Sequence, residues 1–218
     1  MMQIECSAIL FDLDGVLVDS ADCILRLWEG WAERNDLDLE EIMRVAHGRR
    51  AVETIRIVAP HLSAEDEARK LAEIEATDMR GVVVIDGAIP LLQSLPSDAW
   101  AIVTSGVRTV VTPRLERLGL PVPKFMITAD DVVKGKPDPE PYLAGAKVLG
   151  VPVEQCVVVE DAPAGIAAAK GAGMRTIAVA STHALDELTM ATAVANRLSD
   201  LAVEPGNDGR LRIQITNV

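Results

Sequence analysis

The sequence has 218 residues, 49% of them hydrophobic and 25% charged, with a formal net charge of −12. These proportions are typical of a globular protein of one or two domains with a sizeable core. The negative charge argues against binding to nucleic acid or to an anionic membrane surface, and no apolar run approaches the roughly 20 residues that span a membrane. Three cysteines without metal-ligand spacing, and an N-terminus unlike a signal peptide, predict a cytoplasmic protein with buried free thiols.

The first predicted element is a strand over residues 4–10, an apolar run that leads into the sequence FDLDGVLVDS. Asp12 and Asp14 lie two apart at the carboxyl end of this strand, where they would face the same side. Two carboxylates on one side repel each other unless a divalent cation lies between them. The alternative is an ordinary turn, because Asp and Gly are common turn formers.

The next segment, residues 20–86, predicts helix after helix and no convincing strand. The helices are expected at residues 21–35, 39–45, 51–58 and 63–79. Residues 81–87 are expected to lead the chain back into the core. The segment is therefore predicted to be a helical insertion between the first and second core strands.

From residue 87 onward, apolar strand-like runs alternate with helical patterns. Strands are predicted at 100–104, 125–128, 156–160 and 175–179, and helices at 87–95, 107–118, 139–149 and 164–172. This alternation indicates right-handed βαβ units and a parallel sheet, with functional groups at the carboxyl ends of the strands. After a predicted turn at 204–209, residues 211–216 alternate apolar and polar side chains as an edge strand would.

Three further motifs carry chemistry at these strand ends. Residues 101–106 end in Thr104, Ser105 and Gly106, whose hydroxyl and backbone amides would donate to a phosphate. Lys136 lies in GKPDPEPY and would offset clustered carboxylates, whereas Lys134 is expected at the surface. A strand ends in the acids Glu160 and Asp161. The alternatives are a strand-ending threonine and acids that cap the next helix.

The four motifs, in this order, resemble those of the haloacid dehalogenase superfamily. The resemblance implies an α/β fold, a Rossmann-like parallel-sheet core over residues 1–19 and 87–218, with an α-helical cap domain over 20–86. It implies hydrolysis of a phosphate monoester, in which Asp12 is the nucleophile and Asp14 the general acid and base. Thr104 and Lys136 would bind the phosphate, and a cis peptide bond is expected between Lys136 and Pro137.

The same resemblance implies a magnesium ion, a hard cation that takes oxygen ligands. Its expected ligands are the Asp12 and Asp161 carboxylates and the Asp14 backbone carbonyl. Glu160 would act beside the ion, directly or through water. A small phosphorylated metabolite is then the expected partner, and a monomer or weak dimer the expected state.

A closer resemblance, to glycerol-3-phosphatases and 2-deoxyglucose-6-phosphatases, is carried by His47-Gly48-Arg49-Arg50 and by GKPDPEPY. It implies a small sugar or polyol phosphate as substrate, with His47 and Arg50 reaching its hydroxyls or phosphate. The alternative is a surface arginine pair and a capping histidine. In that case these side chains would not contact the substrate.

The sequence has two alternative interpretations of function. β-Phosphoglucomutases share the four motifs, but their relatives carry a histidine at the start of the cap, where this sequence has Ile24. A catalytically silent binding protein on the same fold is the other alternative. The complete set of acids together with Lys136 argues against a silent protein.

Overall fold

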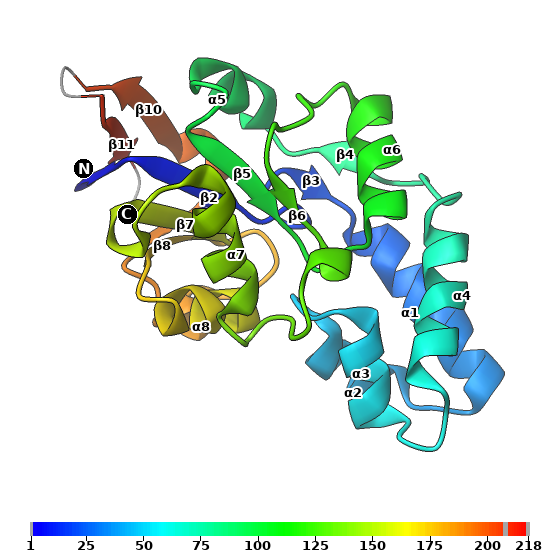
Figure 1. The fold of residues 1–218 in the computed structure, drawn as a ribbon. Helices are drawn as coiled ribbons and strands as arrows, with labels where there is room; N and C mark the ends of the chain where they lie inside the picture. The colour runs from blue at the N-terminus through cyan, green and yellow to red at the C-terminus, as the bar shows by residue number, and fades with distance from the viewer. Residues whose placement is uncertain (1, 207–208, 217–218) are drawn as a thin grey trace.

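The computed structural model describes residues 2–206 and 209–216, and its centre is a six-stranded parallel sheet (Figure 1). The spatial order of the strands is β6-β5-β2-β7-β8-β9. Their bounds are β2 Ala8–Phe11, β5 Trp100–Val103, β6 Met126–Ile127, β7 Cys156–Glu160, β8 Arg175–Val179 and β9 Ala193–Ala195. The predicted α/β class and parallel sheet are confirmed. The sequence did not predict β9, a three-residue strand.

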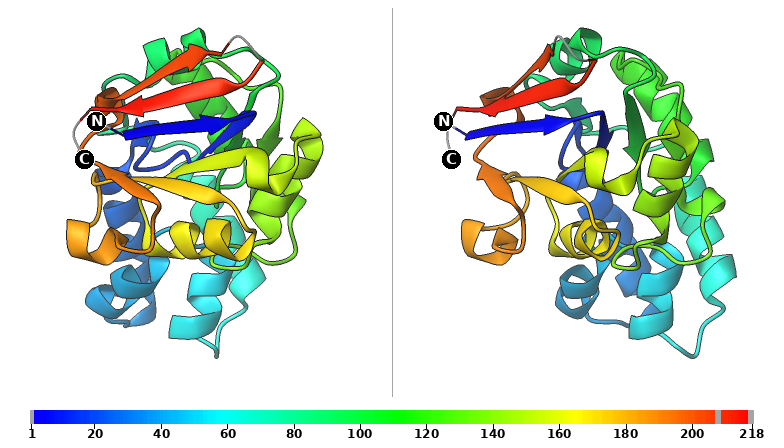
Figure 2. Two further views of the ribbon diagram at one scale, coloured as in Figure 1. Left: turned by 90° about the vertical axis from the view of Figure 1, so that its left-hand side faces the viewer. Right: turned by 60° about the vertical axis from the view of Figure 1, so that its left-hand side comes forward.

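Helices cover both faces of this sheet (Figure 2). One face packs against α5 (Ala88–Ser94) and α6 (Arg108–Leu118) through Ile9 and Phe11 of β2. The other face packs against α7 (Glu140–Leu149) and α8 (Pro163–Gly171) through Ala8 and Leu10. Successive side chains of a strand point to opposite faces, so the continuous apolar run of β2 is what a strand buried on both faces requires.

A second sheet of three antiparallel strands lies beside the first, in the order β1-β11-β10. Its strands are β1 Met2–Cys6, β11 Leu211–Ile215 and β10 Leu201–Pro205. The sequence predicted one strand over 4–10, which is wrong. The chain changes sheets at Ser7, whose amide and hydroxyl both bond to Gln155 at 2.8 Å.

The position predicted for β11 is also wrong, because β11 is the central strand and pairs on both sides. Its side chains alternate between buried and half-buried, and this pattern marks a sheet covered on one face, whether the strand is central or at the edge. The sequence did not predict its neighbour β10. Residues 207 and 208 of the predicted turn lie outside the described residues.

The predicted helical insertion is present between two short antiparallel strands, β3 (Val18–Asp19) and β4 (Val83–Val84). We call this insertion, residues 20–86, the helical unit. Its helices are α1 Ala21–Asn35, α2 Leu39–Ala46, α3 Ala51–Val58 and α4 Ala64–Glu75. They enclose a separate apolar cluster that includes Trp28, Trp31 and Leu71.

Two details of the insertion differ from the prediction. The sequence did not predict β4, which has only two residues. The last helix ends at Glu75 rather than at residue 79. Just beyond this end, the Thr77 hydroxyl donates to the Ile74 carbonyl at 2.9 Å and so competes with the helical backbone.

Among the residues that the structure describes, none of the helices combines the length and the apolar character needed to cross a bilayer.

Candidate active site

The predicted motifs meet at the carboxyl edge of the six-stranded sheet. Asp12 directly follows β2, Thr104 follows β5, and Glu160 ends β7. In the parallel register, Phe11 lies opposite both Ile102 and Val159, so the residues that follow these strands are neighbours. The topology thus brings together side chains that are up to 148 residues apart.

Lys136 is the centre of this cluster. Its Nζ donates to Asp12 Oδ1 at 2.8 Å, to Glu160 Oε1 at 2.7 Å and to the Val103 carbonyl at 3.0 Å. The side chain is 1% exposed, and the peptide bond to Pro137 is cis. The predicted position of Lys136 among the carboxylates and the cis bond are both confirmed, and Lys134 is exposed as expected.

Glu160 is fully buried and accepts hydrogen bonds on both of its oxygens. Its Oε1 accepts from Lys136 and from the Tyr142 hydroxyl at 2.7 Å. Its Oε2 accepts from the backbone amides of Asp161 (3.0 Å) and Ala162 (3.2 Å). Four donors therefore hold this carboxylate in place, and in this arrangement it orients Lys136.

Burial and mutual charge shift the pKa values of the cluster. Desolvation, the largest cause, raises the pKa of Asp12 to about 7 although Lys136 acts in the opposite direction. Desolvation also raises the pKa of Asp161, and the nearby charge of Glu160 adds to the rise. Burial alone would lower the pKa of Lys136, but the charges of Asp12 and Glu160 outweigh it and raise the pKa.

The cluster fits a divalent cation. Asp12, Glu160 and Asp161 each offer a carboxylate oxygen, and these oxygens lie within 4.8 Å of one another. When all three carboxyl groups are ionised, one lysine leaves an excess of two negative charges, which is costly to bury without a counterion. Asp161 Oδ1 is buried and has no hydrogen-bond partner among the described residues. Oxygen ligands and this charge balance suit a hard divalent ion.

Asp14 has different partners from the rest of the acids. Its Oδ1 accepts from Arg114 Nη1 at 2.8 Å and from the Ser20 hydroxyl. Arg114 is 2% exposed, and its Nη2 donates to Glu75 Oε1 of α4 at 2.8 Å. Arg114 therefore joins the loop after β2 to the helical unit. The Asp14 carboxylate lies outside the group of three that could hold a metal.

The predicted phosphate-binding residues lie beside Asp12, but some of their donors are already used. Thr104 is buried, and its Oγ1 accepts from the Gly106 amide at 3.1 Å. The Ser105 hydroxyl donates to the Gly48 carbonyl of the helical unit at 2.8 Å. Thr104, Ser105 and Gly106 all border the same cavity as Asp12.

This cavity lies between the core and the helical unit and has a volume of about 520 Å³. The core contributes its polar end, with Asp12, Asp14 and Thr104. The helical unit contributes apolar side chains, which include Ile24, Leu27, Trp28 and Leu71, and the polar residues His47, Arg49 and Arg69. Such a volume is typical of small-molecule sites.

His47 and Arg50, the two residues of the helical unit predicted to reach substrate, differ in their surroundings. His47 borders the cavity, and its ring meets that of His183 at 5.2 Å between centroids and an interplanar angle of 79°. Arg50 also borders the cavity, but it is 7% exposed and both Nη atoms are hydrogen-bonded. A substrate contact by Arg50 stays a prediction, and its present partners do not favour it.

Three residues of the site were missed by sequence reasoning. Tyr142 lies in the quoted GKPDPEPY motif and holds Glu160. Thr182 follows β8 and hydrogen-bonds to Asp161 Oδ2, so a strand-end hydroxyl was a usable signal. Arg114 lies inside α6 in a segment without any motif, and no signal in the sequence could have found it.

Comparisons with known proteins agree with this geometry. The profile of the haloacid dehalogenase-like hydrolase family matches residues 9–179. Hexitol phosphatase A of Escherichia coli (strain K12) is 40% identical over 215 residues, which cover 96% of this chain and 100% of that protein. Glycerol-1-phosphate phosphohydrolase 2 of Saccharomyces cerevisiae is 39% identical over 199 residues, which cover 86% of this chain and 80% of that protein. A hydrolase from Pseudomonas syringae shares the fold with a TM-score of 0.78 and 28% identity, covering 88% of this chain and 94% of the other.

The chain therefore belongs to the haloacid dehalogenase-like hydrolase family. Within that family it is an enzyme, a phosphatase. The family and the enzyme class predicted from the motifs are both confirmed.

Proposed function

We propose that this enzyme hydrolyses small sugar or polyol phosphate monoesters through a phosphoryl group carried on Asp12, with Mg²⁺ as cofactor. The observation that carries the proposal is the position of Asp12. Asp12 borders the cavity, its Oδ1 lies 2.8 Å from the ammonium of Lys136, and it belongs to the group of three carboxylates that suits a divalent ion.

The reaction has two steps. A carboxylate oxygen of Asp12 attacks phosphorus, the bond to the substrate oxygen breaks, and Asp14 gives its proton to the leaving alcohol. Water then attacks the same phosphorus, Asp14 takes its proton, and the bond to Asp12 breaks to release inorganic phosphate. Asp14 borders the cavity, and Arg114 and Ser20 hold its Oδ1.

Charge spreads over the phosphoryl oxygens during transfer, so fixed donors and cations around them lower the barrier. In this chain Lys136 supplies one positive charge, Thr104 a hydroxyl, and Ser105 a backbone amide. Asp12 and Asp161, with the Asp14 carbonyl, would hold Mg²⁺, which supplies further charge at these oxygens when bound. Glu160 is fully hydrogen-bonded and acts by orienting Lys136.

The substrate class follows from the cavity and from the relatives. A volume of about 520 Å³ suits a molecule of sugar size, and the curated relatives named above are phosphatases of hexitol phosphate and glycerol 1-phosphate. We further propose that the helical unit, residues 20–86, acts as a cap that closes over this substrate and excludes water. A mutase is disfavoured, since Ile24 occupies the place where the resemblance to mutases requires a histidine.

The test is a phosphate-release assay on the purified enzyme with hexitol phosphates, glycerol phosphates and hexose phosphates, each with Mg²⁺ and with EDTA. We expect hydrolysis of hexitol or glycerol phosphate that stops with EDTA and returns with excess Mg²⁺. Formation of glucose 6-phosphate from β-glucose 1-phosphate, with no release of phosphate, would instead establish a mutase. Full activity in EDTA would remove the metal from the proposal.

A further inference from the structure

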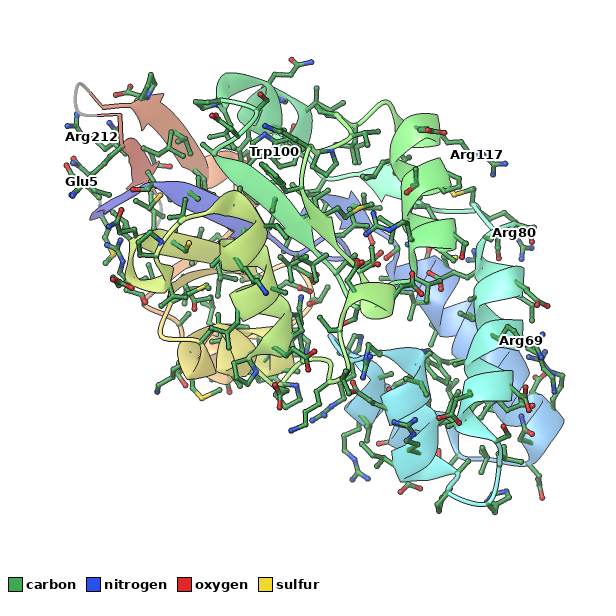
Figure 3. All side chains as sticks on the ribbon, in the orientation of Figure 1. Glu5, Arg69, Arg80, Trp100, Arg117 and Arg212 are labelled. Atoms are coloured by element: carbon green, nitrogen blue, oxygen red, sulfur yellow. The ribbon has the colours of Figure 1, made fainter. Side chains whose placement is uncertain are left out.

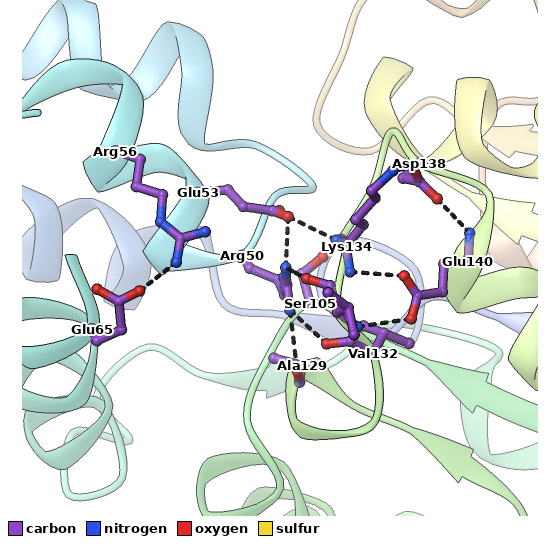
Figure 4. A network of polar contacts seen from close by, with 12 residues as sticks. Arg50, Glu53, Arg56, Glu65, Ser105, Ala129, Val132, Lys134, Asp138 and Glu140 are labelled. Atoms are coloured by element: carbon purple, nitrogen blue, oxygen red, sulfur yellow. Dashed lines mark hydrogen bonds and ion pairs between the residues drawn. The ribbon is translucent and has the colours of Figure 1, made fainter.

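The turn between α2 and α3, which carries the HGRR sequence, contacts the core through the Arg50 side chain. Arg50 Nη1 donates to the carbonyls of Val132 (2.8 Å) and Ala129 (3.4 Å). Its Nη2 donates to the Val133 carbonyl at 2.6 Å and to Glu53 Oε1 at 2.7 Å. Figure 4 shows these bonds running from the helical unit to one core loop.

Glu53 completes the connection from the same helix. Its Oε1 accepts from the backbone amide of Gly135 at 2.7 Å as well as from Arg50. Gly135 is the residue before Lys136. A single carboxylate oxygen of the helical unit therefore bonds to the backbone immediately beside the lysine that contacts Asp12.

The contacted loop, residues 129–135, is tied to the core at its start, where the amide and the guanidinium of Arg108 donate to Asp130 and Asp131, both at 2.7 Å, and where Val132 packs partly against the core. Farther along, Val133 is 82% exposed and Lys134 is exposed, so neither of these two side chains anchors the loop beside Lys136. On the core side, Glu140 accepts from the amides of Val133 and Lys134, both at 2.8 Å. Residues 132–135 of the loop are thus held by polar bonds from Glu140 of the core and from Arg50 and Glu53 of the helical unit (Figure 4).

The close approach depends on Gly135. A Cβ atom at this position would lie 2.5 Å from Glu53 Oε2 and 2.7 Å from Arg50 Nε, which is nearer than side-chain atoms approach each other. Both of these atoms are buried and have no hydrogen-bond partner among the described residues. A methyl group there would displace the Glu53 and Arg50 side chains from their present positions against the loop.

We propose that Arg50 and Glu53 are positioning residues that hold loop 129–135 and thereby place Lys136, so that seating of the cap and assembly of the catalytic centre are one event. The proposal rests on the proposed function, in which the Lys136 ammonium acts on the phosphoryl group. In this proposal Arg50 acts by holding the loop and does not bind the hydroxyls of the substrate.

The chemistry explains why the placement matters. Lys136 Nζ has three acceptors within 3.0 Å, and a displacement of about 1 Å would break that geometry and is enough to cost roughly 100-fold in rate. When the cap opens, Arg50 and Glu53 leave the loop, and Lys136 loses part of its support. A substrate that seats the cap therefore completes the site around its own phosphate.

The experiment compares three variants, Arg50→Ala, Glu53→Ala and Gly135→Ala, in the full-length enzyme. Hydrogen exchange is measured for peptides that cover residues 129–138, and kcat and KM are measured with glycerol phosphate and with p-nitrophenyl phosphate. Arg56→Ala is the matched control for Arg50, because Arg56 lies on the same helix and pairs with the exposed Glu65 of the helical unit (Figure 4). Gly30→Ala is the control for Gly135, since its Cβ would meet only Arg34 Nη1, at 3.4 Å.

We expect amide exchange in 129–138 to become about tenfold faster or more in all three variants, as loss of one charge-assisted hydrogen bond implies. We also expect kcat to fall by about 100-fold on both substrates alike, with Arg50→Lys restoring part of it. A rise of KM confined to glycerol phosphate, with exchange unchanged, would overturn the proposal and make Arg50 a substrate ligand. The exchange result does not need turnover, so it separates failure of this proposal from failure of the proposed function.

Discussion

Charged side chains are buried at the carboxyl edge of the six-stranded sheet, whereas a charged pair on the three-stranded sheet is exposed. At the first, Asp12, Lys136 and Glu160 are at most 5% exposed and have one another as partners. At the second, Glu5 lies opposite Arg212 across β1 and β11 with 3.9 Å between their charged atoms, and the side chains are 51% and 42% exposed (Figure 3). Water and salt screen the second pair but not the first group.

In this molecule the buried charged side chains mark the candidate active site, and the exposed ones do not. A buried carboxylate is costly unless it is balanced, so the acids around Lys136 either take up protons, as the raised pKa values of Asp12 and Asp161 indicate, or are compensated by a ligand or an ion. The exposed pair costs little and stabilises little. Arg50 and Arg114 belong with the buried group, because each is at most 7% exposed and each joins the helical unit to the core.

The largest effect is expected from Asp12→Asn. Because the amide is a poor nucleophile, turnover should fall by about 10⁴-fold or more. Because the amide oxygen can still accept a hydrogen bond from Lys136, the fold should persist. Steady-state phosphate release and a circular dichroism melt of the same sample measure the two properties. A folded Asp12→Asn protein with near wild-type turnover would contradict the assignment of the nucleophile.

A smaller effect, on stability, is expected from Arg114→Met. The substitution leaves Asp14 and Glu75 without the cation that both contact, and breaking a buried ion pair from one side costs about 3 kcal/mol of unfolding free energy. Urea denaturation measures it. The double variant Arg114→Met/Glu75→Gln should lose less than the sum of the two single variants, since the two residues interact.

If Arg114→Met lowers the unfolding free energy by less than about 1 kcal/mol, the range of exposed pairs, then Arg114 behaves like the exposed Arg212 and does not belong with the buried group. The effect of the same variant on kcat separates two roles of Arg114. If Arg114 holds Asp14 for proton transfer, kcat falls while KM changes little. A purely structural role would leave kcat of the folded fraction unchanged.

The smallest effect is expected from Glu5→Gln. The charged pair with Arg212 is exposed, so the unfolding free energy should change by about 0.5 kcal/mol or less. Turnover should stay at the wild-type level, which makes this variant a baseline for the other two. A loss of several kcal/mol by urea denaturation would show that the three-stranded sheet depends on this pair.

The α/β class and the parallel sheet could be predicted from the amino-acid sequence alone. The strand ends that carry the acids, the hydroxyls and the lysine could be predicted from it as well. The reason is that these features are local. Apolar runs of strand length alternate with helical patterns, and the carboxyl ends of parallel strands share one edge, so Asp12, Thr104 and Glu160 had to meet once the strands were assigned.

Only the tertiary structure decided which side chains of different elements pair. The division of residues 4–10 into β1 and β2 depends on Gln155, which is 148 residues away from Ser7. Arg114 meets Asp14 because α6 packs against the loop after β2, and it meets Glu75 because α6 packs beside α4. Arg50 meets loop 129–135 because of how the helical unit packs on the core. An arginine in a helix has the same local pattern whether it is exposed or buried between domains, and only the packing of those elements determines its partner.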